Sequence, residues 1–271
     1  MKLIKPVDWK SETSFTVDGL EFFGDLQTYT EQTTPDRVVI LKDSRLLRQY
    51  LDFLEPRQTD NLFELGIWQG GSPLFYSLAT DVKRVVALDI LNKDPPPDAL
   101  TGAPASRVAY RNPAIDEIIK KRGLANKVNL NFGVSQADPI AVKAIIDREF
   151  GDEPIDIVID DASHHYDLSR RSFEIIFPRL RVGGFYIIED WHWAHIDDAR
   201  YQSGETFGGQ PALSNLIFEL VVAYGSHPDL FWNIIVRDWF VALQRGSKPL
   251  PDDDFRLDEL MRMRGKTLTL I

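Results

Sequence analysis

The sequence predicts an α/β fold with a doubly wound, mainly parallel sheet, an antiparallel C-terminal strand pair and a small N-terminal cap. Short apolar segments, mostly β-branched or aromatic, alternate with segments of helical periodicity. The predicted strands are 61–65, 84–90, 127–132, 155–160 and 185–189, and the predicted helices between them are 73–80, 113–122, 139–150 and 166–180. Strands separated by crossover helices pair in parallel, so this sheet is expected to be buried on both faces.

The flanking segments differ from this alternating centre. Residues 1–58 contain a polar, Thr-rich stretch and a predicted helix at 44–54, and we expect a cap packed on the domain formed by residues 59–271. The Pro-rich stretch 91–106 is too long for an ordinary connection, which favours a surface loop over part of a site. An irregular segment, 191–210, precedes a helix at 211–224. The following LFWNIIVRDWFVALQRG predicts two antiparallel strands that turn near Arg237 and Asp238.

Composition excludes several classes of function. The net charge of 31 − 41 = −10 argues against a nucleic-acid partner, because binding to phosphates requires clustered Lys and Arg. The chain has no Cys, which excludes disulfides and thiolate sites and fits a reducing compartment. The start lacks the apolar core of a signal peptide, and no later run approaches the roughly 18 apolar residues of a membrane span. We therefore expect a cytoplasmic protein.

The stretch NLFELGIWQGGSPL places a Gly-rich turn directly after the first strand of the alternating region. In an open α/β sheet, ligands bind beyond the carboxyl ends of the strands, and glycines there let the backbone approach the ligand. Glu64 precedes the turn, and Asp89 ends the next strand. A pyrophosphate would be repelled by Glu64, whereas a cationic ligand would not.

This pattern resembles the first motif of the class I methyltransferases that use S-adenosylmethionine. The resemblance implies that Glu64, Gly66 and Gly70 line the methionine side of the cofactor and that Asp89 holds its ribose. Trp68 departs from the family, which often has Gly there, so its side chain is expected to point away from the cofactor or to shape a neighbouring wall. A dinucleotide-binding turn and a purely structural tight turn remain alternatives for the glycines.

A second polar stretch, NLNFGVSQAD, follows the third strand of this region. Methyltransferases of this class commonly bind the adenine there, and the resemblance makes Ser135 and Gln136 the candidates. For Asp138 we prefer a structural role as the cap of the helix that opens at Pro139.

Carboxylates end the last two predicted parallel strands, in the sequences IDIVIDD and FYIIED. These strands are expected to be neighbours, which would bring Asp161, Glu189 and Asp190 together at one edge. Three uncompensated carboxylates repel one another, and a hard divalent cation with oxygen ligands removes that repulsion. Mg²⁺ suits this set better than Zn²⁺ because the set has no Cys.

The combination IDDASHH followed by IIED resembles the metal-dependent O-methyltransferases of macrolide deoxysugars and a related cephalosporin-biosynthesis protein. That resemblance implies Asp161, Glu189 and Asp190 as metal ligands and His164 as the general base, with His165 as the alternative base. Asp160 is expected to face away from the site and to hydrogen-bond the next helix, because neighbouring strand residues alternate.

The sequence thus predicts an O-methyltransferase that uses S-adenosylmethionine, assisted by Mg²⁺, and methylates a hydroxyl of a small acceptor such as a glycosylated natural product. A metal-independent methyltransferase, an NAD-binding oxidoreductase and a non-catalytic partner protein remain alternatives. We expect the segment 191–210 to order over the acceptor, with Trp191 and Trp193 either facing the acceptor or packing on the cap. The oligomeric state stays open, with a homo-oligomer among the options.

Overall fold

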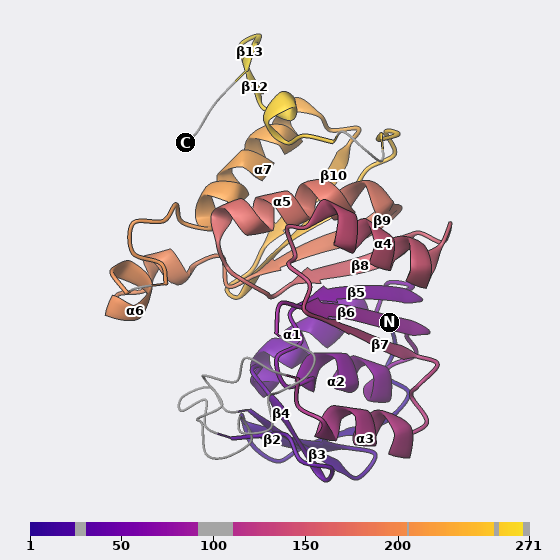
Figure 1. Ribbon diagram of the computed structural model, residues 1–271. Helices are drawn as coiled ribbons and strands as arrows, with labels where there is room; N and C mark the ends of the chain where they lie inside the picture. Colours follow the sequence, from indigo (N-terminus) through magenta and orange to yellow (C-terminus); the bar gives the residue numbers. More distant parts are fainter. Residues whose placement is uncertain (25–30, 92–110, 205, 252–254, 268–271) are drawn as a thin grey trace. The chain divides into compact units, whose positions relative to one another are not determined.

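The structure, a computed structural model, describes residues 1–24, 31–91, 111–204, 206–251 and 255–267. The chain divides into two compact units, Met1–Val134 (unit 1) and Ser135–Ile271 (unit 2), drawn in indigo to magenta and in magenta to yellow in Figure 1. The boundary between these units lies after residue 134. The predicted boundary between a cap of residues 1–58 and a domain of residues 59–271 stays a prediction. The Pro-rich stretch expected to form a surface loop lies almost entirely outside the described residues.

Unit 1 contains three parallel strands in the order β5-β6-β7, with crossover helices between sequential strands. The strands are β5 (Asn61–Leu65), β6 (Arg84–Asp89) and β7 (Val128–Phe132), and the helices are α2 (Gly71–Ala79) and α3 (Ala114–Lys121). Every residue of β5 is buried, as expected for a strand covered on both faces. All five elements fall within two residues of the predicted ranges.

The N-terminal part of unit 1 is a four-stranded sheet that the sequence analysis did not predict. It comprises β1 (Val7–Trp9), β2 (Ser14–Val17), β3 (Leu20–Gly24) and β4 (Arg37–Ile40), and helix α1 (Ser44–Leu54) follows it at the predicted position. Phe15 and Phe22 stack at 5.1 Å between ring centroids, and both contact the edge of Phe75 on α2. The N-terminal sheet therefore packs on α2 through aromatic rings.

Unit 2 contains four strands in the order β10-β11-β9-β8. They are β8 (Ile155–Asp160), β9 (Leu180–Glu189), β10 (Phe231–Val236) and β11 (Phe240–Arg245). Strands β8 and β9 are parallel, and β11 pairs antiparallel with both β9 and β10. The predicted neighbours and the predicted antiparallel C-terminal pair are confirmed, so both units have the α/β character expected from the sequence.

Strand β9 begins earlier than predicted. We expected a helix up to residue 180 and a turn at Gly183 and Gly184, but Leu180 already pairs with Ile155 and Phe185 with Ile157, so β9 bulges there. Gly183 has φ +85°, and a Cβ on Gly184 would lie 2.6 Å from the carbonyl oxygen of Asp156. The two glycines thus serve a bulge in a strand rather than a turn between elements.

Helices α4 (Pro139–Phe150), α5 (Tyr166–Ile176) and α7 (Ser214–Ser226) lie beside the strands of unit 2, whereas the short α6 (Ala199–Gln202) stands away from them (Figure 1). The remaining elements are the 3₁₀ turns η2 (Phe177–Arg179), η3 (Trp193–His195) and η4 (Asp258–Leu260) and a hairpin of two short strands, β12 (Arg262–Met263) and β13 (Lys266–Thr267). Asp138 caps α4 by accepting from Ile140 and Ala141, as predicted. Helix α5 contacts both α4 and α7. Among the described helices, none has the length and hydropathy needed to cross a bilayer.

Candidate active site

The turn from β5 into α2 has a strained backbone. Gly66 and Gly70 have φ of +100° and +80°, and Trp68 between them has φ +45°. A Cβ on Gly70 would lie 2.9 Å from Ile115, and one on Gly71 would lie 2.6 Å from the Val39 carbonyl oxygen. The fold of unit 1 therefore requires two of these glycines for its own packing. Trp68 is the unusual residue of the turn, because bulky residues rarely adopt a left-handed backbone. Backbone strain of this kind concentrates at functional sites.

The carboxylate of Asp89 organises this turn. Its Oδ2 accepts from the backbone N–H groups of Ile67 and Trp68 at 2.7 and 2.8 Å, and its Oδ1 accepts from Leu91 at 2.9 Å. A carboxylate offers about four acceptor positions, so these bonds leave capacity for one further donor. Asp89 can thus hold the turn and still accept from a bound ligand.

Glu64, at the other side of the turn, is fully buried. Its Oε1 accepts from the Ser72 hydroxyl, in the first turn of α2, at 2.5 Å. The acid that the sequence placed before the glycines is therefore tied to the start of the following helix.

Gln69 was missed by the sequence analysis, although it fixes the same turn to the N-terminal part of unit 1. Its side chain is buried: Nε2 donates to the Glu31 carbonyl at 2.7 Å, and Oε1 accepts from the Thr33 N–H at 2.6 Å and from Asn112 at 3.3 Å. A lone Gln in a turn carries no sequence signal for such contacts, because its partners are more than 30 residues away.

The two adenine candidates, Ser135 and Gln136, differ in what their side chains do. The Ser135 hydroxyl accepts from the Ala137 N–H at 3.3 Å and is partly exposed. The buried Gln136 amide donates to Asp160 and Ser172 and accepts from Ser163. The side chain of Gln136 is thus engaged inside unit 2, which restricts any contact of this residue with an adenine to its backbone.

Asp161, His164 and Asp190 form one cluster at the carboxyl ends of β8 and β9. One ligand atom from each lies within 4.8 Å of the others, and His164 Nε2 is 3.9 Å from Asp161 Oδ1 and 4.0 Å from Asp190 Oδ2. The side chains are 14–22% exposed, so solvent reaches them only partly. The pairing of β8 with β9 brings together groups that lie almost 30 residues apart in the sequence.

Two of these three residues have a left-handed backbone. His164 and Asp190 both have φ +57°. Asp190 follows the last residue of β9, and its N–H donates to the Trp239 carbonyl at 2.9 Å, which fixes the point where the chain leaves the sheet. Asp and His tolerate this conformation better than most side chains, but it still costs free energy. Its occurrence at two of three clustered residues marks the cluster as a functional candidate.

Glu189 does not belong to this cluster in the structure. It is the last residue of β9, it is 2% exposed, and it lies opposite Phe240 of β11. The sequence predicted Glu189 as a third carboxylate ligand, and that role stays a prediction. The next residue, Asp190, has a left-handed backbone with φ +57°.

Asp160 faces away from the cluster, as predicted. It accepts from Ser172 on α5 at 2.9 Å, from Tyr186 at 3.0 Å and from Gln136 at 3.1 Å. Burial raises the pKa of the Asp160 carboxyl to about 6, because the charged form is poorly solvated there. This residue therefore ties α5 to β9 and to Gln136.

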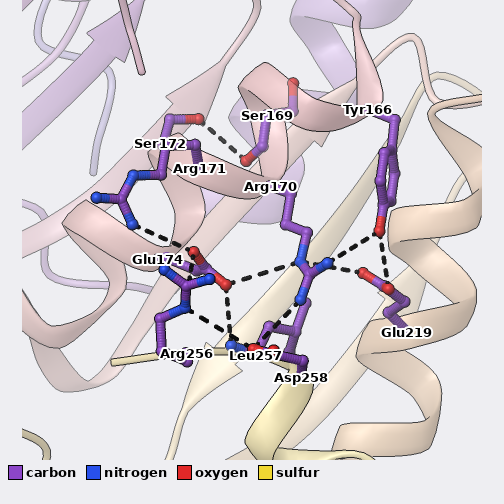
Figure 2. A network of polar contacts seen from close by, with 10 residues as sticks. All are labelled: Tyr166, Ser169, Arg170, Arg171, Ser172, Glu174, Glu219, Arg256, Leu257 and Asp258. Carbon is purple, nitrogen blue, oxygen red and sulfur yellow. Dashed lines mark hydrogen bonds and ion pairs between the residues drawn. The ribbon is translucent and has the colours of Figure 1, made fainter. Parts of the chain in front are cut away.

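A buried polar network fixes the start of α5, directly after His164 and His165 (Figure 2). The Tyr166 hydroxyl donates to Glu219 of α7 at 2.8 Å and accepts from Arg170 at 3.2 Å. Arg170 also lies 3.7 Å from Glu174. Burial, and then the hydrogen bond to Glu219, raise the pKa of Tyr166 to about 12. The network couples α5 to α7.

The C-terminal segment joins the same network. The Leu257 N–H donates to Glu174 Oε1 at 3.0 Å, and Asp258 lies 3.5 Å from Arg170. Arg256 lies 3.9 Å from Glu174 (Figure 2). These contacts fasten three segments of unit 2 that are distant in sequence, and no sequence motif signals them.

The segment after Asp190 folds into short helices. Trp193 contacts the imidazole of His164 with 4.4 Å between ring centroids, whereas the Trp191 indole N–H donates to the Arg237 carbonyl. His195 pairs with the Ser214 hydroxyl at 2.9 Å, and burial lowers the pKa of His192. Of the two tryptophans considered in the sequence, Trp193 is therefore the one at the cluster.

The donor set of the cluster fits a hard divalent cation. Mg²⁺ prefers carboxylate oxygens as ligands, and the cluster offers one carboxylate from Asp161 and one from Asp190, with ligand atoms within 4.8 Å of each other. His164 Nε2 lies 3.9 and 4.0 Å from these carboxylates, close to any cation that they hold. Two carboxylates and an imidazole also supply the negative charge and the proton acceptor that an alcohol substrate requires.

Comparison with known proteins adds a family. Residues 63–191, just under half of the chain, match the model of a family described as "Methyltransferase domain". The chain is 39% identical to L-olivosyl-oleandolide 3-O-methyltransferase of Streptomyces antibioticus over 74 residues. This aligned segment makes up 27% of this chain and 18% of that protein. It is 48% identical to mycinamicin VI 2''-O-methyltransferase of Micromonospora griseorubida over 65 residues. This segment makes up 24% of this chain and 14% of that protein. The chain thus covers a fifth or less of these relatives.

Among solved structures, the fold is similar to that of the MycE methyltransferase from the mycinamycin biosynthetic pathway in complex with Mg, SAH and mycinamycin VI. The TM-score is 0.52 at 22% identity, over 74% of this chain and 49% of that chain. At this identity the similarity concerns the fold, and it extends over about half of the larger protein.

Proposed function

Since the chain carries a class I S-adenosylmethionine-dependent methyltransferase domain, as predicted from its sequence, we propose that it is an O-methyltransferase, assisted by Mg²⁺, for a hydroxyl of a small glycosylated acceptor. The observation that carries this proposal is the Asp161–His164–Asp190 cluster, in which two acids surround one candidate base. The named relatives methylate hydroxyls of glycosylated natural products, which supports the acceptor class.

Residues of the β5–α2 turn would hold the cofactor. Glu64, Gly66, Gly70 and Asp89 remain the candidates, and the geometry of Asp89 supports the best-defined role among them. Its carboxylate fixes the turn and keeps one acceptor position for a ribose hydroxyl. In the adenine region, Ser135 offers a side chain, whereas Gln136 would contribute its backbone.

Asp161 and Asp190 would hold the cation, with Glu189 as a further candidate ligand. When bound, the cation would lower the pKa of the acceptor hydroxyl, and S-adenosylmethionine would supply the methyl group on its sulfonium. His164 Nε2 would accept the proton of the acceptor hydroxyl. The partial burial of His164 limits competition from water for the proton.

Three substitutions test this division of roles. Asp161→Asn removes a proposed cation ligand and should weaken Mg²⁺ binding in calorimetric titrations of the full chain. Asp167→Asn is the matched control, because this exposed acid lies in the first turn of α5, outside the cluster. His164→Ala should leave S-adenosylmethionine binding unchanged and lower turnover roughly 10²–10⁴-fold, the range for loss of a positioned base. His165→Ala should have a much smaller effect.

The outcomes separate the proposal from its alternatives. Full activity in a chelator would favour a metal-independent methyltransferase, and binding of NAD in place of S-adenosylmethionine would favour an oxidoreductase. Loss of turnover in His165→Ala alone would move the base by one residue. A cytoplasmic location, the absence of a nucleic-acid partner and a homo-oligomeric state stay predictions; the net charge of −10 supports the second.

A further inference from the structure

We infer that Trp193 is a positioning residue for His164: its indole sets the orientation of the imidazole toward Asp161 and Asp190. This inference rests on the proposed role of His164 as the base. The two rings pack with 4.4 Å between centroids and an interplanar angle of 49°. Trp193 belongs to the segment after β9, and His164 to the loop after β8, so the contact joins two chain segments at the cluster.

The torsion that orients the imidazole has only a soft intrinsic preference. The χ2 torsion of His joins sp³ and sp² atoms and has a broad, roughly two-fold preference. Nε2 lies 3.9 and 4.0 Å from the two carboxylates. A planar indole against the ring restricts its rotation by packing.

Trp193 is itself held in place from several directions. Its ring contacts Tyr201 at 4.9 Å and Phe207 at 5.8 Å between centroids. The Gln202 amide donates to the carbonyls of Ala194 and Ile196, both at 2.8 Å, which fixes the turn that carries Trp193. The indole is therefore held in place by its own segment, so its contact with His164 restricts the orientation of the imidazole.

The same aromatic cluster continues to the next residue of the base loop. His165 stacks on Phe207 with 5.2 Å between centroids and an angle of 28°. Consecutive histidines are thus packed against two rings of one segment, so the segment and the loop support each other. A misplaced base lowers the rate steeply, because small errors in position cost up to about 100-fold.

Trp191 provides a matched control in the same segment. It lies two residues from Trp193 and has the same side chain, but it donates to the Arg237 carbonyl at 3.1 Å and its ring neighbours are His192 and His195, more than 6 Å away between centroids. Trp193→Leu and Trp191→Leu therefore remove equal volumes, and only the first removes a contact with His164.

The decisive measurement is the NMR resonance of the His164 ring ε1 proton in the full chain, assigned with His164→Ala. Trp193→Leu should remove the ring-current shift of this resonance, Trp193→Phe should retain part of it, and Trp191→Leu should leave it unchanged. Turnover with mycinamicin VI as the first acceptor probe should fall roughly 10- to 100-fold in Trp193→Leu and recover to within about 3-fold of wild type in Trp193→Phe. The affinities for S-adenosylmethionine and Mg²⁺ should stay within about 2-fold.

An unchanged His164 resonance in Trp193→Leu, or an equal change in Trp191→Leu, would overturn the inference. If Trp193→Leu does not fold, the His164 ε1 resonance of Trp193→Phe is compared with that of wild type instead. An identical chemical shift in the two proteins would contradict the contact between the Trp193 and His164 rings. Full activity of His164→Ala would instead remove the proposed base and leave the ring contact itself intact. The two failures are thereby distinguishable.

Discussion

Replacement of Asp89 separates two tasks that we assign to one carboxylate: holding the glycine turn and binding the ribose of the cofactor. The first is visible in the three backbone N–H groups that donate to it. The second is the role implied by the resemblance to class I methyltransferases. The structure indicates that Asp89→Ala also loosens the turn.

The magnitude follows from those bonds. Hydrogen bonds to a charged group contribute about 1.5–3 kcal/mol each, so the two bonds to Oδ2 amount to about 3–6 kcal/mol. Water replaces part of this because the site is only partly buried. We therefore expect Asp89→Ala to lower the free energy of unfolding by about 2–4 kcal/mol. Asp89→Asn keeps one acceptor oxygen for the turn, so its loss should be smaller, about 1–2 kcal/mol.

The assay uses urea unfolding for the turn and calorimetry for the ribose. Wild type should bind SAH more tightly than its 2′-deoxy analogue by about 10-fold or more, if Asp89 accepts from the hydroxyl. Asp89→Ala should bind both weakly and with less than about 3-fold difference, since the partner of that hydroxyl is gone. Asp52→Ala, an exposed acid on α1, is the control and should change neither quantity. Discrimination that persists in Asp89→Ala would refute the ribose assignment, and unchanged stability would refute the role in the turn.

Three further predictions concern unit 2. Asp161→Asn should raise the Mg²⁺ concentration for half-maximal activity, whereas His164→Ala should lower turnover without that shift; metal titrations of activity check this, and identical titration midpoints would contradict it. Burial raises the pKa of Glu219, so the folded state holds this proton more tightly than the unfolded state and stability is lost as pH rises through the raised value. Glu219→Gln has no such titratable group, so its stability lacks this dependence on pH. In urea unfolding, the free energy of unfolding of wild type minus that of the variant should therefore fall as pH rises from 4.5. A difference that grows with pH would contradict the raised pKa. Limited proteolysis in the segment 191–210 should slow when cofactor, Mg²⁺ and acceptor are all present; equal cleavage rates would exclude a closing segment.

Local sequence determined most of the parallel α/β elements. Apolar runs and helical periodicity predicted β5, β8 and α4 to the residue, because such patterns are read within a dozen positions. The N-terminal sheet was missed: its short strands gain their stability from pairing with one another and from packing on α2, which no single strand reveals. The early start of β9 was missed for the same reason, since the bulge at Gly183 and Gly184 is defined only by its pairing with β8.

The candidate site shows the same division. The resemblance of IDDASHH and IIED to metal-dependent O-methyltransferases implied Asp161 and His164 for one site, and the grouping of Asp161 with Asp190 followed from the expected neighbourhood of the two strands. Only the tertiary structure showed that ligand atoms of Asp161, His164 and Asp190 lie within 4.8 Å of one another and that Asp190 has a left-handed backbone, whereas Glu189 as a further ligand stays a prediction. Only it distinguished Trp193 from Trp191, since alternation cannot be followed through a 3₁₀ turn. Residue types thus determined the chemistry available to this protein, while long-range pairing and backbone conformation decided which of those residues meet.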